Sequence, residues 1–163
     1  MDTTKIRLLT RSIREKHGVH KPPVNVFDIA ANEEIDVVYF SPPDDAKDVS
    51  GLLVKEEKRV YLNADEPMER RAFTLAHELA HYFLEHEPSE YGVYRRSSLY
   101  LSEKSLTERE ADRFAAELLM PQEFVTELMK KYSLTARDTD VLAKMFVVSQ
   151  VAMDRRLKEL GIA

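Results

Sequence analysis

The sequence predicts an α+β protein in which a small antiparallel β-sheet of about three strands packs on a helical core and further helices follow. Two patterns carry this prediction. β-branched and aromatic residues concentrate in short runs between residues 35 and 63, whereas apolar residues recur at helical spacing in most of the remaining chain. The 163 residues suit one compact domain with a small appendage, and 44% hydrophobic residues are enough to form a core.

Two helices are expected before the sheet. Ile6, Leu9 and Ile13 lie at helical spacing, and Gly18 follows where such a helix would end. Residues 24–33 (VNVFDIAANE) predict a second, short helix, because its apolar side chains also share one face.

Three strands are expected next. IDVVYF (35–40) is apolar and rich in β-branched residues, and SGLLVK (50–55) and RVYLN (59–63) predict a hairpin joined by Glu56-Glu57-Lys58. A sheet of this size needs a helix against one face to be stable. The next segment, about residues 67–86, is amphipathic and supplies that helix.

The second half of the chain predicts mainly helices. Residues 87–105 lack periodicity and predict a long loop, a type of segment that often has a function. Helices are expected over 106–120 and 121–132, and residues 135–161 predict a helix, a turn and a helix with Ser149 as N-cap. We therefore expect residues 1–132 to form the domain that carries the chemistry and residues 133–163 to form a helical segment packed on it.

Charge and composition exclude several classes of protein. The net charge is −5, so no overall basic field attracts nucleic acid or anionic lipid. The absence of cysteine excludes disulfides, thiolate metal sites and thiol nucleophiles. No apolar run approaches the length of a membrane span, and the N-terminus lacks the apolar core of a signal peptide. A cytoplasmic protein without membrane contact is expected.

The strongest chemical signal is His77-Glu78-Leu79-Ala80-His81, an HExxH motif. On a helix, imidazoles at positions i and i+4 point the same way and can share one metal ion. Both histidines fall just beyond the apolar face of the helix, where a cleft at the rim of the core can form. Glu78 is the candidate general base of a metal-assisted hydrolysis.

A third ligand is expected on a second helix. The HExxHxxGxxH pattern fails, because position 84 is Leu, position 87 is Glu, and His86 comes one residue too early. Glu108 and Asp112 instead lie four residues apart in SLTEREADRFAAELLMP, so Glu108 is the candidate ligand and Asp112 the carboxylate that orients a ligand histidine. Glu110 is the alternative metal ligand.

Both glutamates also have a purely structural interpretation. Thr107-x-x-Glu110 and Ser105-x-x-Glu108 each fit a capping box at the start of a helix. The grouping of acidic residues beside apolar helix faces nevertheless favours a cation, since such carboxylates would otherwise repel one another and lose hydration. Two imidazoles and a carboxylate without a thiolate favour zinc (Zn2+), with manganese (Mn2+) or iron (Fe2+) chemically admissible.

These segments resemble the ImmA/IrrE-type metallopeptidase family over nearly the whole chain. RRAFTLAHELAH (70–81) resembles the signature around the family's HExxH, and EREADRFAAELLMP (108–121) resembles a second signature whose first Glu is the third zinc ligand. Weaker similarity covers PVNVFDIA (23–30), DVSGLL (48–53) and a helix-turn-helix-like segment, LAKMFVVSQVAMDRRLKELG (142–161). Asp112 departs mildly from the pattern, in which Asn is frequent, and either residue can orient an imidazole.

The resemblance implies a zincin-like, cytoplasmic endopeptidase in which His77, His81 and Glu108 bind zinc and Glu78 is catalytic. It further implies that the substrate is a helix-turn-helix transcriptional repressor, expected to be co-encoded, whose cleavage relieves repression of mobile-element or stress-response genes. Within this function, we expect strand 59–63 to be a sheet edge that pairs with extended substrate and loop 87–105 to control access.

Two alternatives belong to other classes. One is a non-catalytic, metal-stabilised regulator, and the other is a toxin–antitoxin component that acts by binding a partner protein or DNA. DNA binding by the C-terminal segment is not favoured, because residues 137–159 hold five basic and four acidic side chains. If this segment binds DNA, we expect Arg155 and Arg156 to contribute.

Overall fold

The structure is a computed structural model that describes residues 2–44, 47–87 and 105–163 and the backbone of 94–97. It divides into two compact units, one formed by Met1–Val24 and Ala116–Ala163 and the other by Asn25–Ala115. These two units are defined by how the chain packs. The predicted boundary between residues 132 and 133 instead separates the part expected to carry the chemistry from the C-terminal helical segment, and it stays a prediction. Among the described residues, no helix combines the length and apolar character needed to cross a bilayer.

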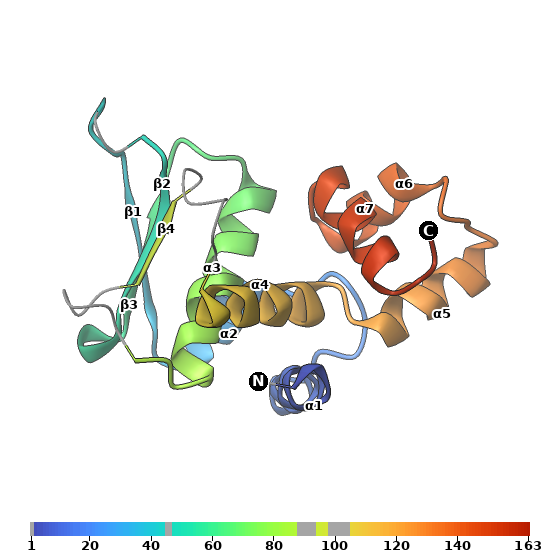
Figure 1. Ribbon diagram of the computed structural model, residues 1–163, viewed down its shortest axis with the longest axis horizontal. Coiled ribbons are helices and arrows are strands. Elements are labelled where there is room, and N and C mark those ends of the chain that lie inside the picture. Colours follow the sequence, from blue (N-terminus) through green and yellow to red (C-terminus); the bar gives the residue numbers. More distant parts are fainter. Residues whose placement is uncertain (1, 45–46, 88–93, 98–104) are drawn as a thin grey trace. The chain divides into compact units, whose positions relative to one another are not determined.

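The unit Asn25–Ala115 contains a four-stranded sheet with helices, so the predicted α+β class is confirmed. Figure 1 shows the sheet nearly edge-on, with helix α3 (Met68–Phe83) along one of its faces. In chain order its elements are α2 (Val26–Asn32), β1 (Asp36–Phe40), β2 (Val49–Val54), the 3₁₀ turn η2 (Lys55–Glu57), β3 (Arg59–Asn63), α3 (Met68–Phe83), β4 (Tyr94–Ser97) and the greater part of α4 (Leu106–Leu119).

The sheet differs from the expected three-stranded antiparallel one. Its strand order is β1-β3-β2-β4, and β1 runs parallel to β3, whereas β2 is antiparallel to both β3 and β4. The β2–β3 hairpin therefore lies between β1 and β4 in the sheet. The hairpin was predicted correctly, but the neighbour of β1 is not its successor in the chain.

The same order corrects two further expectations. Strand 59–63 is not an edge strand, because β3 pairs with β1 on one side and with β2 on the other. Its backbone groups are therefore engaged within the sheet and cannot pair with extended substrate. Residues 87–105 are not loop throughout, since Tyr94–Ser97 form β4. The rest of the expected access loop, 88–93 and 98–104, lies outside the described residues.

Helix α3 packs closely against β2 one turn before the HExxH motif. The apolar residues of α3 that face the sheet and core are buried, namely Ala72, Leu75, Ala76, Leu79 and Ala80. Gly51 in β2 lies opposite Thr74 in α3, and a Cβ atom at Gly51 would meet Thr74 Cγ2 at 2.4 Å and the Tyr61 carbonyl oxygen at 3.3 Å. The missing side chain of Gly51 thus sets the distance between the sheet and the helix that carries the histidines.

We expect Gly51→Ala to destabilise the protein by about 1–3 kcal/mol, because the new methyl group overlaps a stiff β-branched side chain. Urea unfolding measures the change. The double variant Gly51→Ala/Thr74→Ser removes the methyl group that is met, so it should be more stable than the sum of the two single changes predicts. Additive single and double variants would show that Gly51 does not limit this packing.

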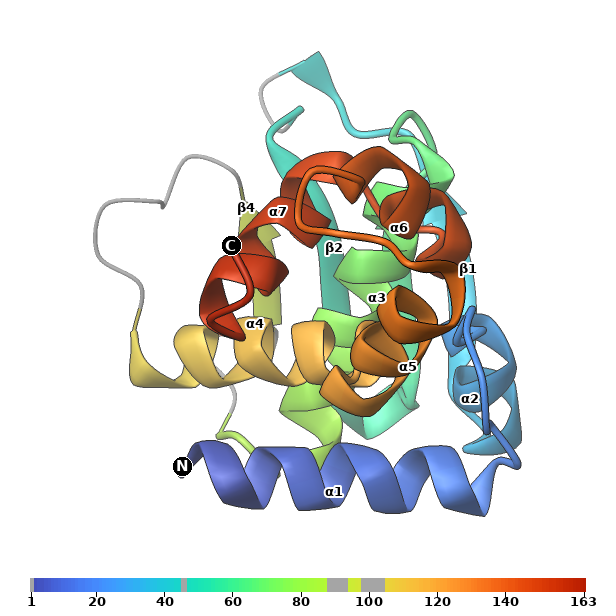
Figure 2. The ribbon, with the colours of Figure 1, turned by 90° about the vertical axis from the view of Figure 1, so that its right-hand side faces the viewer.

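The other unit consists of helices α1 (Thr3–Lys16), α5 (Gln122–Tyr132), α6 (Thr139–Phe146), α7 (Gln150–Glu159) and the end of α4. The predicted helix, turn and helix are confirmed. Val147 adopts a left-handed conformation after α6, and the Ser149 side chain accepts a hydrogen bond from Ala152 N at 3.2 Å as the N-cap of α7. Figure 2 shows α6 and α7 packed against each other.

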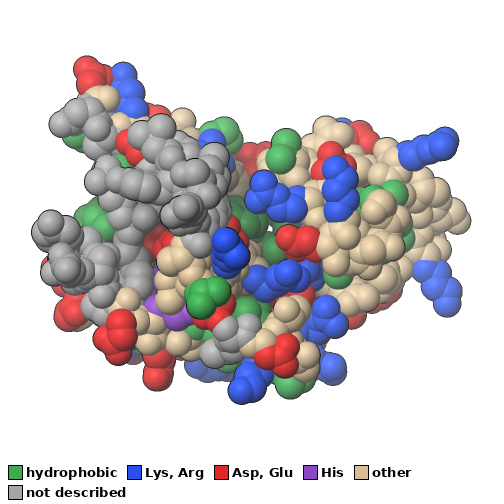
Figure 3. All heavy atoms as spheres, viewed as in Figure 1, with side chains coloured by type: hydrophobic (Ala, Val, Ile, Leu, Met, Phe, Trp, Pro, Cys, Tyr) green, Lys and Arg blue, Asp and Glu red, His purple; other side chains and the backbone are tan. Residues whose placement is uncertain are grey.

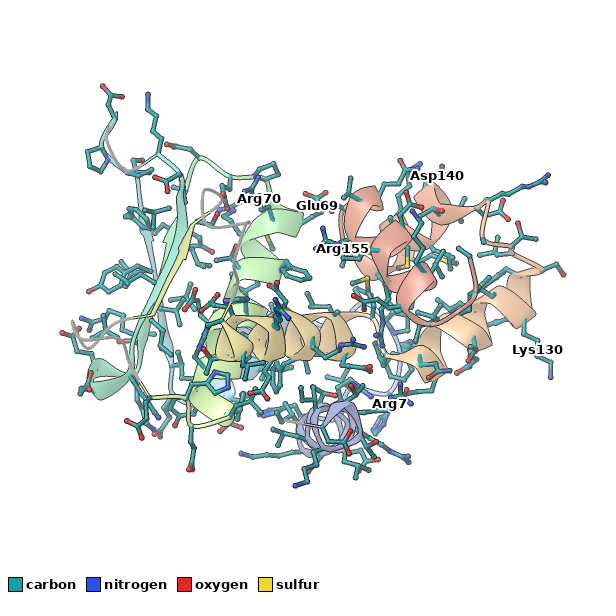
Figure 4. The ribbon with its side chains drawn as sticks, in the orientation of Figure 1. Arg7, Glu69, Arg70, Lys130, Asp140 and Arg155 are labelled. Carbon is teal, nitrogen blue, oxygen red and sulfur yellow. The ribbon has the colours of Figure 1, made fainter. Side chains whose placement is uncertain are left out.

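The two adjacent arginines of α7 have different environments. The Arg155 side chain is exposed and extends away from the helix in Figure 4. Arg156 is 1% exposed, lies 2.8 Å from Glu117 Oε2, and donates from Nε to the Met120 carbonyl oxygen at 2.9 Å. Arg156 therefore stabilises the interior of its unit and cannot contact phosphate. This corrects the expectation that Arg155 and Arg156 would both contribute to DNA binding. The expectation that this segment does not bind DNA stays a prediction, and Arg155 is the residue that tests it.

Candidate metal centre

Helices α3 and α4 bring two imidazoles and one carboxylate together. His77 Nε2 lies 3.1 Å from Glu108 Oε2, His81 Nε2 lies 3.3 Å from Glu108 Oε1, and the two Nε2 atoms are 3.3 Å apart. Helical geometry explains the histidine pair, since residues four apart on α3 project from one face. The three residues form a group whose potential ligand atoms all lie within 4.8 Å of one another.

These separations fit a tetrahedral metal site. Ligand atoms at about 2.0–2.1 Å from a tetrahedral zinc ion are about 3.3–3.4 Å from one another, as the geometry of the tetrahedron requires. The three observed separations, 3.1, 3.3 and 3.3 Å, are close to this value. Three protein ligands would leave a fourth position for water or substrate, which is the composition of a catalytic rather than a structural zinc site.

The start of α4 explains how Glu108 reaches the histidines. Ser105 Oγ accepts a hydrogen bond from Glu108 N at 3.2 Å, so the helix is capped by the serine of the Ser105-x-x-Glu108 frame. The Glu108 carboxylate itself lies with the imidazoles. One turn later, Asp112 Oδ1 lies 3.0 Å from His77 Nδ1, where a carboxylate can hold the ring with Nε2 directed at the group.

Glu110, the alternative ligand, lies elsewhere. Its Oε2 atom is 3.2 Å from His86 Nε2, and it is not a member of the group of three found among the described residues. His86 in turn places its Nδ1 atom 2.9 Å from His81 Nδ1. The sequence thus contains a second imidazole–carboxylate pair beside the first, and the spacing of the motifs did not predict this pairing.

Glu78 occupies the position between the two histidines of the motif and is completely buried. Burial of an ionised carboxylate has a high desolvation cost unless positive charge or hydrogen bonds offset it. A divalent ion held by the neighbouring residues would supply such charge. His77 and His81 are themselves nearly completely buried. Figure 3 shows a small purple area of histidine on the face viewed.

The electrostatics of the group favour the protonation states that metal ligands need. Burial lowers the pKa of His81, and burial together with the His81 ring lowers the pKa of His86 to about 4. Burial alone would raise the pKa of Glu108, but hydrogen bonds with His77 and His81 outweigh it and hold this pKa well below its ordinary value. Near pH 7 this leaves neutral imidazoles at residues 81 and 86 and an ionised carboxylate at 108, as metal binding requires.

The chain is similar to proteins of a known family. Residues 32–158 match the IrrE N-terminal-like domain family (Peptidase_M78). The chain is 25% identical to Metallopeptidase ImmA of Bacillus subtilis over 158 residues, which cover 96% of this chain and 86% of that protein.

A solved structure supports the fold. A Mycobacterium tuberculosis transcriptional regulator superposes with a TM-score of 0.66 at 18% identity, over 94% of this chain and 46% of that protein. The chain therefore spans less than half the length of this structural relative. Because the family match extends over most of the 163 residues and includes both helices that carry the group of three, the chain belongs to the IrrE N-terminal-like family of ImmA/IrrE-type metallopeptidases.

Proposed function

We propose that the protein is a zinc-dependent endopeptidase that cleaves a specific regulatory protein. The observation that carries the proposal is the convergence of His77, His81 and Glu108 at separations suited to one tetrahedral ion. Family membership supports the reaction class. Zinc is the preferred ion because the donor set is two imidazoles and a carboxylate, and manganese and iron remain chemically admissible.

Each residue has a definite role in this proposal. His77, His81 and Glu108 hold the ion, and Asp112 fixes the orientation of His77. When bound, the ion supplies Lewis acidity, which polarises a peptide carbonyl and acidifies water. Glu78 accepts the proton of the attacking water on its carboxylate and then donates it to the departing amine. The nearly complete burial of the histidines keeps bulk water away from the ligand atoms.

The proposed substrate is a helix-turn-helix transcriptional repressor encoded near this protein, and its cleavage would relieve repression. Support for this substrate comes from the family resemblance alone, since the named relatives are a metallopeptidase and a transcriptional regulator. A cytoplasmic location is part of the proposal. It is supported by the absence of cysteine, which is typical of proteins that need no disulfides.

Metal analysis tests the site directly. We expect about one zinc per chain, measured by plasma mass spectrometry on protein purified without added metal or chelator. His77→Ala and Glu108→Ala should each remove it, because each deletes one of the three ligands that a catalytic zinc site uses. Glu127→Ala, on an exposed position of α5, is the matched control and should retain the full amount.

Two outcomes of the metal analysis would contradict the proposed site. If wild-type protein contains no metal and takes up none on titration with zinc, the group of three is not a metal site. A protein of this kind would act by binding its partner. If zinc is present but survives both ligand substitutions, the ion lies elsewhere in the chain.

A further inference from the structure

We propose that His86 and Glu110 are positioning residues for His81, connected to it by hydrogen bonds through the His86 ring. This inference rests on the proposed function, in which His81 is a metal ligand. The observed connections are His81 Nδ1 to His86 Nδ1 at 2.9 Å and His86 Nε2 to Glu110 Oε2 at 3.2 Å. The two ring nitrogens of His86 thus link the ligand to a carboxylate of α4.

The end of α3 places His86 at this point. The helix ends at Phe83, Leu84 is its C-cap, and Glu85 adopts a left-handed conformation with φ of 53°. This turn brings the chain back, so that His86 N donates to the His81 carbonyl oxygen at 3.1 Å. The His86 ring therefore lies beside the ring of His81, with their centroids 5.0 Å apart, and only 8% of the residue is exposed.

The direction of each hydrogen bond follows from the role of His81. A neutral imidazole carries its proton on one nitrogen, and Nε2 must be unprotonated to bind a metal. The proton of His81 is therefore on Nδ1, which donates to His86 Nδ1. Since His86 accepts on Nδ1, its own proton is on Nε2, which donates to the Glu110 carboxylate.

Each of the two ligand histidines then donates a hydrogen bond from Nδ1, but to a different partner. His77 donates from Nδ1 directly to Asp112, 3.0 Å away, whereas His81 donates to His86, which donates to Glu110. Hydrogen bonds of this kind fix the tautomer and orientation of a ligand and increase its basicity. Three residues of α4, Glu108, Glu110 and Asp112, thus supply one ligand and the end points of both hydrogen-bond routes.

Zinc affinity tests the proposal without any activity assay. The dissociation constant is measured by competition with a chromogenic chelator. His86→Leu should weaken zinc binding by about 10–100-fold while still leaving about one zinc per chain at saturation, because ligand-orienting partners have effects of this size. His86→Asn places an amide oxygen close to the position of Nδ1 and should recover part of the affinity. Exposed His20 provides the matched control, His20→Leu, with unchanged affinity.

Substitution of Glu110 tests the outer end of the chain of hydrogen bonds. Glu110→Ala should also weaken zinc binding, by less than His86→Leu, since it leaves the contact between the two rings in place. Melting of the metal-free variants identifies any general loss of folding. A variant that weakens zinc binding only because it unfolds does not support a positioning role.

Nitrogen-15 NMR of the histidine side chains in the zinc-loaded wild-type protein gives an independent test. The proposal requires the proton of His81 on Nδ1 and the proton of His86 on Nε2, and a purely structural role would not fix this pattern. A proton on His86 Nδ1, or unchanged zinc affinity in His86→Leu, would overturn the proposal. If the wild-type protein itself binds no zinc, the proposed metal function fails, whereas zinc binding that is insensitive to His86 and Glu110 overturns only the positioning role.

Discussion

Glu78→Gln is expected to reduce peptide cleavage by about 10²–10⁴-fold while leaving the zinc content of the protein unchanged. The amide has nearly the same shape as the carboxylate but cannot accept the proton of the attacking water. Because Glu78 is completely buried, replacement by a neutral group also removes a buried charge and should not unfold the protein. The rate is measured as cleavage of the proposed substrate, a repressor encoded near this protein, followed by mass spectrometry of the fragments.

Glu69→Gln is the matched control, since it makes the same chemical change in the first turn of the same helix (Figure 4). It should cleave the repressor at the wild-type rate. If Glu78→Gln cleaves as fast as the wild type, another group is the general base. If the variant cleaves nothing but still relieves repression in cells, the protein acts by binding its partner, and the endopeptidase function is wrong.

The pairing of His77 with His81 and of Glu108 with Asp112 could be anticipated from the sequence, because each pair depends on the geometry of a single helix. The HExxH spacing projects His77 and His81 from one helical face, and the four-residue spacing of Glu108 and Asp112 does the same on the next motif. The position of His86 could not be anticipated in this way. It depends on where α3 ends and on the left-handed turn at Glu85, neither of which the apolar periodicity of the helix specifies.

The order of the strands in the sheet could not be predicted from the sequence either. Apolar runs rich in β-branched residues identified the first three strands, and a short connection identified the hairpin. The strand that pairs with β1, however, is β3 and not β2, the next strand in the chain. Strand β4 was missed because YRRS has neither β-branched residues nor apolar alternation. The position of β4 in the sheet is set by its pairing with β2. This tertiary interaction cannot be predicted from residues 94–97 alone.

Arg156→Ala is expected to lower the free energy of unfolding by about 3–5 kcal/mol, because it leaves the Glu117 carboxylate buried beside a vacated site. Both side chains are 1% exposed, and their charged atoms are 2.8 Å apart. The same substitution removes the donor to the Met120 carbonyl oxygen and the packing of the arginine side chain in the interior. Urea unfolding followed by circular dichroism measures the loss.

The adjacent Arg155→Ala is the matched control, because it deletes the same side chain from an exposed position of α7 and should leave stability nearly unchanged. Arg156→Leu/Glu117→Leu should recover much of the lost stability, since neither charge then stays buried alone. Arg7, which lies 3.6 Å from Glu117, is partly exposed and can be hydrated in that variant. Arg14, which donates to the Glu117 carbonyl oxygen, keeps its ion pair with Glu123. Equal stability of Arg155→Ala and Arg156→Ala would mean that Arg156 is accessible in solution, and only then would it return as a candidate contact for phosphate.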